Sequence, residues 1–586
     1  MYPETNSLPK QQPCSLCCEV VDIAGFGGQL NKNSHFEQNL KALLGRNPQL
    51  YSRLLQAKTT MKRYCFSESR SKEIVPALCA GFGNANPLHS MVDPKKEGER
   101  LADSLKDEEG SPGGFVIFLG LGGAYAPQAA LTNSNINHVI VIDFDINGIA
   151  ELFCSKNYTK ILEDPRFSLL VDPDPEEVKS FILQQYKPAI CGGIRAIPLR
   201  ARIRQDAHFF DAAKEAIKQA IEKVSGDYSV QAHFGIRWFS NIIRNLKAVQ
   251  TQNTGLAPIK EAAICAAGPS LDTQIPLLKQ EKHKKTFIIS CDTALPALLQ
   301  KDIEPDAVVS IDCQHISYYH FKGLASHKIP LFLDISSPPL LPRLSASPFF
   351  FCGGHPFALY LCQYWRPLPQ IDTSGGNVTY ASLSLAQNLG AQRITLYGCD
   401  FSYPGGRTYA KGTYLERYFA ERQSRFAPLE AQHSSFLYRS PFLPREENKS
   451  YYETASLRFY RKGLEEKAHK MGAEIIAAKG LGAPLNLPKG KQCRFESEKI
   501  APFKAGYAKT GYKEFLEQYR KDIAALPLPQ AYGDGSYWQH LDGKNQLILA
   551  TILPLTAAIK YRSKLETRNL IEEVKYRCLK ELDTQL

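Results

Sequence analysis

Two groups of residues between positions 371 and 411 have the types and spacing of a nucleotide-binding site. The first is a turn of small residues ahead of an expected helix at 377–389: Thr373, Ser374, Gly375, Gly376 and Asn377. Such a turn offers backbone N–H groups and the positive end of a helix dipole, which suit a phosphate. An expected buried strand at 393–397 leads to Asp400, and the loop after it presents Tyr403 and Tyr409. Open α/β sheets bind ligands at the carboxyl ends of their strands, so this grouping indicates a nucleotide site.

A second turn of the same kind lies upstream. Gly268, Pro269 and Ser270 connect an expected strand at 261–267 to a helix. Pro near the first helical position and Ser at the cap are ordinary start signals, so a simple capped helix is the alternative. Two further expected strands, 286–290 and 307–311, lead to Asp292 and Asp312. These acids extend the expected site along the same sheet edge.

Five motifs in order resemble the motility-associated factor (Maf) glycosyltransferase family. They are AGPSL, SCDTAL, SIDCQ, DTSGGN and LYGCDFSYPGG with YAKG after it, within about residues 261–487. The central domain of that family is shared with the archaeal 6-hydroxymethylpterin pyrophosphokinase MptE. It is also similar in fold to bacterial sialyltransferases that use CMP-sialic acid. Upstream, GFVIFLGLGGAY, VIVIDFD and RWFSNIIRNL resemble the amino-terminal Maf domain.

The resemblance to the sialyltransferases implies roles for the loop residues. In those enzymes tyrosine hydroxyls, without a metal, stabilise the departing CMP, and Tyr409 and Tyr403 match that loop. Tyr403 is alternatively a packed aromatic at a Pro-Gly turn. Lys411 and Arg407 add positive charge, which stabilises negative charge as it develops. The 374–376 turn would hold the nucleotide phosphate or ribose, and the 268–270 turn the base or ribose.

A histidine acts as general base downstream of the tyrosine loop in those sialyltransferases. His433 lies in the matching region, and imidazole suits the role because its ordinary pKa is near neutrality. The segment after His433 is longer than the resemblance implies, so His315, His320 and His355 stay as other candidates.

The acids at the strand ends also admit a different chemistry. Asp292, Asp312 and Asp400, if they follow adjacent strands, would hold Mg²⁺ between the oxygens of a pyrophosphate. A pterin pyrophosphokinase that uses ATP and Mg²⁺ needs such a set. In the glycosyltransferase interpretation the same acids hold ribose or sugar hydroxyls, and no cofactor is required beyond the CMP-sugar donor. No GxxxxGK[ST] loop occurs in the sequence, which argues against a P-loop kinase.

A third glycine turn lies near the amino terminus. Gly120, Gly122 and Gly123 follow an expected strand, and Asp143 ends the next one. This pattern is typical of dinucleotide or S-adenosylmethionine sites, but Ala126 stands at the third glycine position. We favour a structural or acceptor-recognition role for this turn, with a methyltransferase as the alternative.

Composition excludes several classes of protein. The chain has 586 residues, 44% of them hydrophobic, and a net charge of +12 that is spread along the sequence. No nucleic-acid module occurs, so nucleic-acid binding is not expected. The apolar run 547–559 contains Pro554 and is shorter than the roughly 20 residues that span a bilayer, so we expect a core helix and no membrane span. The first residues lack a secretory pattern.

Cysteine usage favours a reducing compartment. Fifteen cysteines, an odd number without framework spacing, indicate free thiols and a cytoplasmic protein. Cys14, Cys17 and Cys18 could form half of a zinc site, but Cys65 and Cys79 are separated and isolated, so no second pair completes it. No metal site is therefore expected there.

Regular alternation of strands and helices predicts an α/β protein with tandem Rossmann-like domains, parallel sheets and a mainly helical carboxy-terminal region. We expect an amino-terminal domain at 1–250, a central nucleotide-binding domain at 251–490 and the helical region at 491–586. Helices are expected at 36–58, 207–224 and 237–249.

The family resemblance implies transfer of a sialic-like nonulosonic acid from a CMP-sugar to serine or threonine of flagellin. The alternatives are the pterin pyrophosphokinase and a flagellin-binding assembly factor with a degenerate site.

Overall fold

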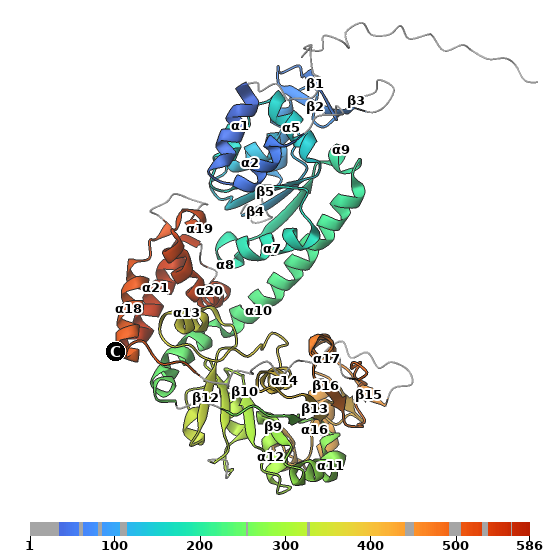
Figure 1. Cartoon of the computed structure of the whole chain (residues 1–586), viewed down its shortest axis with the longest axis vertical. Coiled ribbons are helices and arrows are strands. Elements are labelled where there is room, and N and C mark those ends of the chain that lie inside the picture. Colours follow the sequence, from blue (N-terminus) through green and yellow to red (C-terminus); the bar gives the residue numbers. More distant parts are fainter. Residues whose placement is uncertain are drawn as a thin grey trace, which may run out of the picture. The chain divides into compact units, whose positions relative to one another are not determined.

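A computed structural model describes residues 34–57, 63–79, 85–105, 114–252, 256–324, 328–439, 450–490, 505–529, 537–563, 565 and 567–586 (Figure 1). These residues form two compact units. Unit 1 comprises Met1–Ser229 with Pro527–Gly543, and unit 2 comprises Val230–Leu526 with Lys544–Leu586. The expected α/β class, with parallel sheets and a helical carboxy-terminal region, is confirmed. Cys14, Cys17 and Cys18 lie outside the described residues.

Unit 1 is built on a four-stranded parallel sheet in the order β6-β5-β4-β7. The strands are β4 (Phe115–Leu119), β5 (His138–Asp143), β6 (Phe167–Val171) and β7 (Ile194–Pro198). Every residue of β4 and β5 is buried, as expected for a parallel sheet covered on both faces. Val116 and Phe118 face one core with α1, α2 and α5, whereas Phe115, Ile117 and Leu119 face another with α7 and α10.

The helices of unit 1 connect these strands or cover the sheet. They are α1 (Ser34–Leu44), α2 (Pro48–Leu55), α3 (Pro94–Asp103), α4 (Tyr125–Leu131), α5 (Ile146–Ser155), α6 (Thr159–Leu162), α7 (Pro175–Gln185), α8 (Pro188–Cys191), α9 (Arg200–Ile203) and α19 (Tyr537–His540). The single helix expected at 36–58 is two helices. Asn47 caps α2 by accepting from Leu50 N, and Pro48 occupies its first turn, so the chain restarts there.

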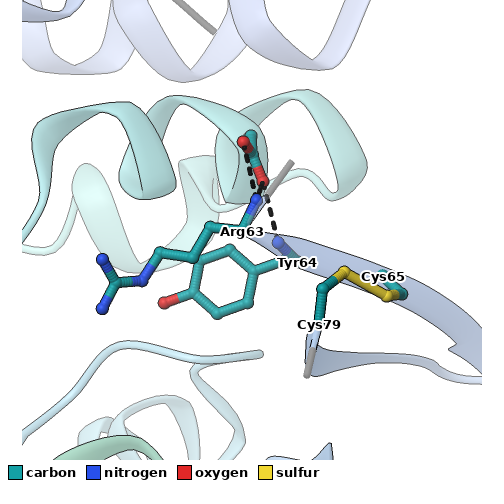
Figure 2. Close-up of a disulfide and its surroundings, with 5 residues drawn as sticks. Arg63, Tyr64, Cys65 and Cys79 are labelled. Carbon is teal, nitrogen blue, oxygen red and sulfur yellow. Dashed lines mark hydrogen bonds between the residues drawn. A yellow bond between two sulfur atoms is a disulfide. The ribbon is translucent and has the colours of Figure 1, made fainter. Parts of the chain in front are cut away.

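A small antiparallel sheet carries a disulfide that the sequence analysis did not predict. The strands β1 (Tyr64–Glu68), β2 (Ile74–Cys79) and β3 (Ala85–Pro87) pair in order, and the hairpin brings Cys65 and Cys79 together with Cα atoms 5.9 Å apart (Figure 2). The backbone N–H groups of Arg63 and Tyr64 donate to the Glu151 carboxylate of α5, which holds the hairpin against the helix (Figure 2). The expectation of free thiols is therefore wrong for this pair.

Helix α10 (Ala207–Thr251) runs without interruption for 45 residues, where two helices were expected (Figure 1). The division between the two units falls within it. Gly226 does not end the helix, because one glycine costs only about 1 kcal/mol of helix propensity and buried faces on both sides outweigh that. Gly235 allows close approach instead, since a Cβ there would lie 1.9 Å from the Pro554 carbonyl oxygen.

Unit 2 contains a seven-stranded parallel sheet in the order β12-β11-β10-β9-β8-β13-β16. The strands are β8 (Glu261–Cys265), β9 (Phe287–Cys291), β10 (Ala307–Ser310), β11 (Leu331–Asp334), β12 (Pro348–Phe351), β13 (Arg393–Tyr397) and β16 (Glu474–Ala477). The strand order reverses between β8 and β13. A separate pair is formed by β14 (Tyr403–Pro404) and β15 (Tyr451–Tyr452).

Helices cover both faces of this sheet. They are α11 (Leu271–His283), α12 (Leu295–Leu299), α13 (Pro356–Tyr364), α14 (Val378–Asn388), α15 (Tyr414–Glu421), α16 (Leu429–Leu437) and α17 (Ala455–Lys470), with 3₁₀ turns at Asp292–Ala294, His315–His320 and Leu341–Leu344. Helices α14 and α17 share one core with the sheet, and α11 and α12 share the other.

The carboxy-terminal helices of unit 2 are α18 (Tyr512–Ala525), α20 (Gly543–Ser563) and α21 (Thr567–Asp583). The apolar run 547–559 lies in α20, where most of its side chains are buried. Within the described residues, no helix combines the length and hydropathy needed to cross a bilayer.

Candidate functional site

The 373–377 turn lies at the start of α14 and is held by its own side chains. Asn377 caps the helix by accepting from Tyr380 N at 3.0 Å, and Gly376 takes a positive φ of 69°. Thr373 Oγ1 donates to the Gly353 carbonyl, while Ser374 and Gly376 are exposed. Ser374 N donates to the Asp372 carboxylate and Gly376 N to the Thr373 carbonyl. N–H groups in the first turn of a helix have no acceptor within that helix, so those of Val378 and Thr379 are the donors that this turn presents to a ligand.

Three residues that the sequence analysis did not single out surround this turn. Lys467 of α17 lies 2.9 Å from Asp372 Oδ2 and 4.7 Å from the Tyr380 ring centre. The Tyr380 hydroxyl donates to the same carboxylate at 2.8 Å. Burial alone would raise the pKa of Asp372, but hydrogen bonds from Ser374, Lys467 and Tyr380 outweigh it and hold the pKa well below its ordinary value. A lysine thus lies beside the 373–377 turn. Sequence could not show this, because Lys467 comes from a distant helix.

The start of α14 lies against the end of β9. Thr379 Oγ1 is 3.7 Å from Cys291 Sγ, and Cys291 immediately precedes Asp292. Asp292 is only 2% exposed, and its carboxylate accepts from the Ser310 hydroxyl at 2.6 Å and from Thr293 N. Asp312 is half-buried and accepts from Gln314 N. Its pKa is raised by burial and by the neighbouring Asp292 charge. The glycine turn and two of the predicted acids therefore meet at one sheet edge.

The tyrosine loop folds over the same edge. Ala410 N donates to the Ala267 carbonyl at 2.9 Å, which fixes the loop beside the end of β8. Burial raises the pKa of Tyr409 to about 12, with further contributions from Tyr403 and Asp292. Burial also raises the pKa of Tyr403. Tyr409 is thus a half-buried, neutral phenol within electrostatic range of Asp292 and Tyr403.

His433 lies on α16 next to this loop. Its Nδ1 is 2.8 Å from Thr408 Oγ1, its ring meets Phe419 edge-on, and it is 5% exposed. Burial and the nearby Arg407 charge lower its pKa, which keeps the imidazole neutral at pH 7. Arg407 itself pairs with Asp272 at 2.7 Å, and Lys411 N donates to the same carboxylate. His433 therefore contacts Thr408, the residue before Tyr409, and its neutral imidazole is able to accept a proton as a general base does.

The other candidate histidines have different surroundings. His355 caps α13 through Nδ1, which accepts from Phe357 N, and burial lowers its pKa to about 3. His320 is 7% exposed, meets Tyr414 edge-on and lies within electrostatic range of Asp312. His315 is exposed and stacks on Tyr318.

The donors of the 268–270 turn are used by the chain, as are those of Ser374 and Gly376 in the 373–377 turn. Gly268 N donates to the Gly398 carbonyl, and Ser270 N donates to Asp400 Oδ2 at 2.8 Å. A Cβ on Gly268 would lie 2.4 Å from that oxygen, so only glycine permits the contact. Burial raises the pKa of Asp400. The expectation that this turn offers free N–H groups is wrong, while its assignment to the base or ribose stays a prediction.

The pyrophosphokinase alternative required Asp292, Asp312 and Asp400 to follow adjacent strands. They do not. Strand β8 separates β13, which precedes Asp400, from β9, which precedes Asp292. Neighbouring strands lie about 4.8 Å apart, so Asp400 is about 10 Å along the edge from Asp292. Among the residues that the structure describes, no group of three or more His, Cys, Asp or Glu side chains is arranged to hold a metal.

The amino-terminal glycine turn in unit 1 is filled by the protein's own side chains. Asp143 is fully buried, pairs with Arg202 at 2.7 Å and accepts from Leu121 N. A Cβ on Gly122 would lie 2.6 Å from His89 Nε2, and one on Gly120 would lie 2.9 Å from Arg202 Cγ. Asp143 is therefore engaged within the fold and is not presented to a ribose.

Comparison with known proteins agrees with this architecture. A solved structure described as a Maf glycosyltransferase from Magnetospirillum magneticum AMB-1 superposes with a TM-score of 0.55, covering 94% of this chain and 95% of that one at 13% identity. The chain has the Maf glycosyltransferase fold. Residues 237–406 match the family described as 6-hydroxymethylpterin diphosphokinase MptE-like. The resemblance seen in the sequence motifs is thereby confirmed.

Shorter similarities link the chain to uncharacterized proteins of Treponema pallidum (strain Nichols). One is 39% identical over 118 residues, covering 20% of this chain and 42% of that protein, and another is 38% identical over 117 residues, covering 19% and 55%. A third is 30% identical over 221 residues, covering 36% and 38%. The chain thus spans about half the length of these relatives or less.

Proposed function

We propose that the protein is a glycosyltransferase that moves a sialic-like nonulosonic acid from a CMP-sugar to serine or threonine hydroxyls of flagellin in the cytoplasm. The observation that carries this proposal is the convergence of three features at the β8–β9 edge of unit 2. They are the start of α14 with its first-turn N–H groups, the half-buried phenol of Tyr409 within electrostatic range of Asp292, and the Thr408–His433 pair. The fold similarity to a Maf glycosyltransferase supports the same reaction class.

Each group then has a defined task. The α14 turn and Lys467 bind the donor phosphate through N–H groups and positive charge. As the bond from the anomeric carbon to the phosphate oxygen breaks, CMP leaves with the bonding electrons, and the Tyr409 hydroxyl donates to the phosphate. His433 takes the proton from the acceptor hydroxyl as the new carbon–oxygen bond forms. Asp292 and Asp312 accept hydrogen bonds from ribose or sugar hydroxyls.

The family match of residues 237–406 keeps a second function in consideration, an ATP- and Mg²⁺-dependent pterin diphosphokinase. That reaction needs metal-bridged phosphates. The separation of Asp400 from Asp292 by a whole strand argues against it. A flagellin-binding assembly factor is the non-enzymatic possibility, and the donors at the start of α14 argue against a degenerate site.

The deciding experiment is calorimetric titration of the full chain with CMP and with ATP, each with Mg²⁺ and with EDTA. The proposal expects saturable CMP binding that persists in EDTA. ATP binding that requires Mg²⁺, without CMP binding, would replace it with the diphosphokinase, and binding of neither would favour the assembly factor.

Matched variants then test the residues. Ser374→Ala and Tyr409→Phe should each strongly reduce transfer from CMP-sugar to flagellin, Tyr409→Phe by about 10²–10³, with unchanged folding by circular dichroism. Tyr576→Phe is the control, because Tyr576 is 61% exposed on α21. Unchanged transfer by both site variants would refute the assignment.

A further inference from the structure

Unit 1 contains a cavity of about 1190 Å³ that the donor site does not use. It is lined at the carboxyl ends of two strands, by Phe118 of β4 with Gly120 and Leu121 after it, and by residues 197–200 at the end of β7 and the start of α9. The sheet order β6-β5-β4-β7 reverses between β4 and β7. Ligands of open α/β sheets bind outside the carboxyl ends of the strands at such a reversal. The cavity therefore lies where this fold places a ligand, and its volume is somewhat above the roughly 300–1,000 Å³ typical of small-molecule sites.

The usual dinucleotide arrangement is not available to that ligand. The acid that would bind a ribose, Asp143, is buried against Arg202, and the side of the glycine turn next to His89 is filled. The ligand must instead be recognised by the groups that line the cavity.

Those groups combine an apolar floor with a cationic rim. The floor includes Leu88, Phe118, Leu121 and Ala126, none of which is more than 8% exposed. The rim carries four exposed cations, namely Arg70, Lys96, Arg100 and Arg200.

The two acids of the lining are already engaged. Asp93 caps α3 by accepting from Lys96 N, and Glu97 accepts from Ser90 N beside His89. Within the described part of the chain, no carboxylate lies within 4 Å of the Arg100 or Arg200 guanidinium groups. Positive charge at the rim is thus left to be neutralised by a ligand.

We propose that this cavity binds a small amphiphilic anion, with an apolar body on the Leu88–Phe118 floor and a carboxylate, phosphate or sulfonate at the Arg100–Arg200 rim. Buried apolar area would supply most of the affinity, and the guanidinium groups would select the anion. The site is separate from the proposed donor site, because all its residues belong to unit 1.

The test uses 8-anilinonaphthalene-1-sulfonate, an aromatic body with one sulfonate, titrated into the full chain by fluorescence and calorimetry. We expect one saturable site per chain that decanoate displaces and that sulfate at equal ionic strength does not. The double variant Arg100→Ala/Arg200→Ala should weaken binding about tenfold or more, as expected for loss of charge-assisted contacts. Arg100→Lys/Arg200→Lys should retain most of the affinity, because it keeps the charge.

The matched control is Lys218→Ala/Lys223→Ala, which removes two exposed charges from α10 of unit 1 and should leave binding unchanged. Equal binding by the Arg100/Arg200 alanine variant and the wild type would overturn the proposal, as would displacement by sulfate as effective as by decanoate. If CMP displaced the probe, the probe would be bound at the donor site of unit 2. That result would overturn the proposal for the unit 1 cavity without affecting the proposed transferase. A lack of CMP binding together with the expected probe results would leave this site standing while the transferase fails.

Discussion

The pH dependence of transfer tests the environment of Tyr409 and His433 together. Burial beside Tyr403 and Asp292 moves the pKa of Tyr409 from 10 to about 12. Two pKa units correspond to about 3 kcal/mol against ionisation, so at pH 9 about 0.1% of the phenol is ionised, where an ordinary tyrosine is about 10% ionised. The hydroxyl therefore remains a donor across the practical range. We therefore expect that ionisation of Tyr409 causes no decline in rate below pH 10. The measurement is the initial rate of transfer to flagellin at saturating donor.

The acid side of the profile should belong to His433. Its pKa is lowered from 6.5 by burial and by Arg407, so the neutral base persists below pH 6.5 and transfer should decline only at lower pH. Tyr409→Phe should lower kcat by about 10²–10³ at every pH, as loss of one donor to developing charge does elsewhere. His433→Gln should lower kcat by about 10²–10⁴ and remove the acid decline. An alkaline decline centred near pH 10 that disappears in Tyr409→Phe would refute the buried-phenol reasoning.

Three further outcomes follow from the contacts of other residues. Lys467→Gln should weaken CMP binding about tenfold in calorimetry through loss of a charge-assisted contact, whereas Lys470→Gln, exposed on the same helix, should not; equal effects would contradict a phosphate-side role. Burial lowers the pKa of His138 to about 4, so the free energy of unfolding should fall by about 3 kcal/mol as the pH falls from 6.5 to 4. In urea unfolding, His138→Gln should lose less stability over the same pH range. Cys65→Ala/Cys79→Ala should destabilise unit 1 by about 3 kcal/mol without reductant, and excess dithiothreitol should bring the wild type to the same level; an unchanged unfolding midpoint would count against the bond.

The parts of the fold that the sequence predicted correctly are those set by local patterns. Expected strands at 261–267, 286–290, 307–311 and 393–397 correspond to β8, β9, β10 and β13 within two residues at each end. Each is a short apolar run that ends near an acid or a glycine, and such runs are buried in parallel sheets. The helix expected at 377–389 corresponds to α14 within one residue at each end, and Asn377 is its cap.

The parts that were missed depend on contacts between distant segments. The Lys467–Asp372 pair joins α17 to the α14 turn, and no spacing rule connects them. The Cys65–Cys79 bond depends on the register of β1 against β2, which the number of residues between the cysteines does not fix. Helix α10 continues past Gly226 because tertiary packing outweighs the local propensity on which the prediction relied.

The same contact between an acid and a glycine turn occurs in both sheets. Its position relative to the strand-order reversal differs between them. In each, an acid at the end of a neighbouring strand or after it accepts from the backbone of a glycine turn: Asp143 from Leu121 N in unit 1, and Asp400 from Ser270 N in unit 2. Asp400 follows β13 and so occupies the strand-order reversal between β8 and β13. The proposed donor site of unit 2 lies on the β9 side of β8, where Asp292 is within electrostatic range of Tyr409. Asp143 ends β5, away from the reversal between β4 and β7, and this leaves the unit 1 reversal open as a cavity.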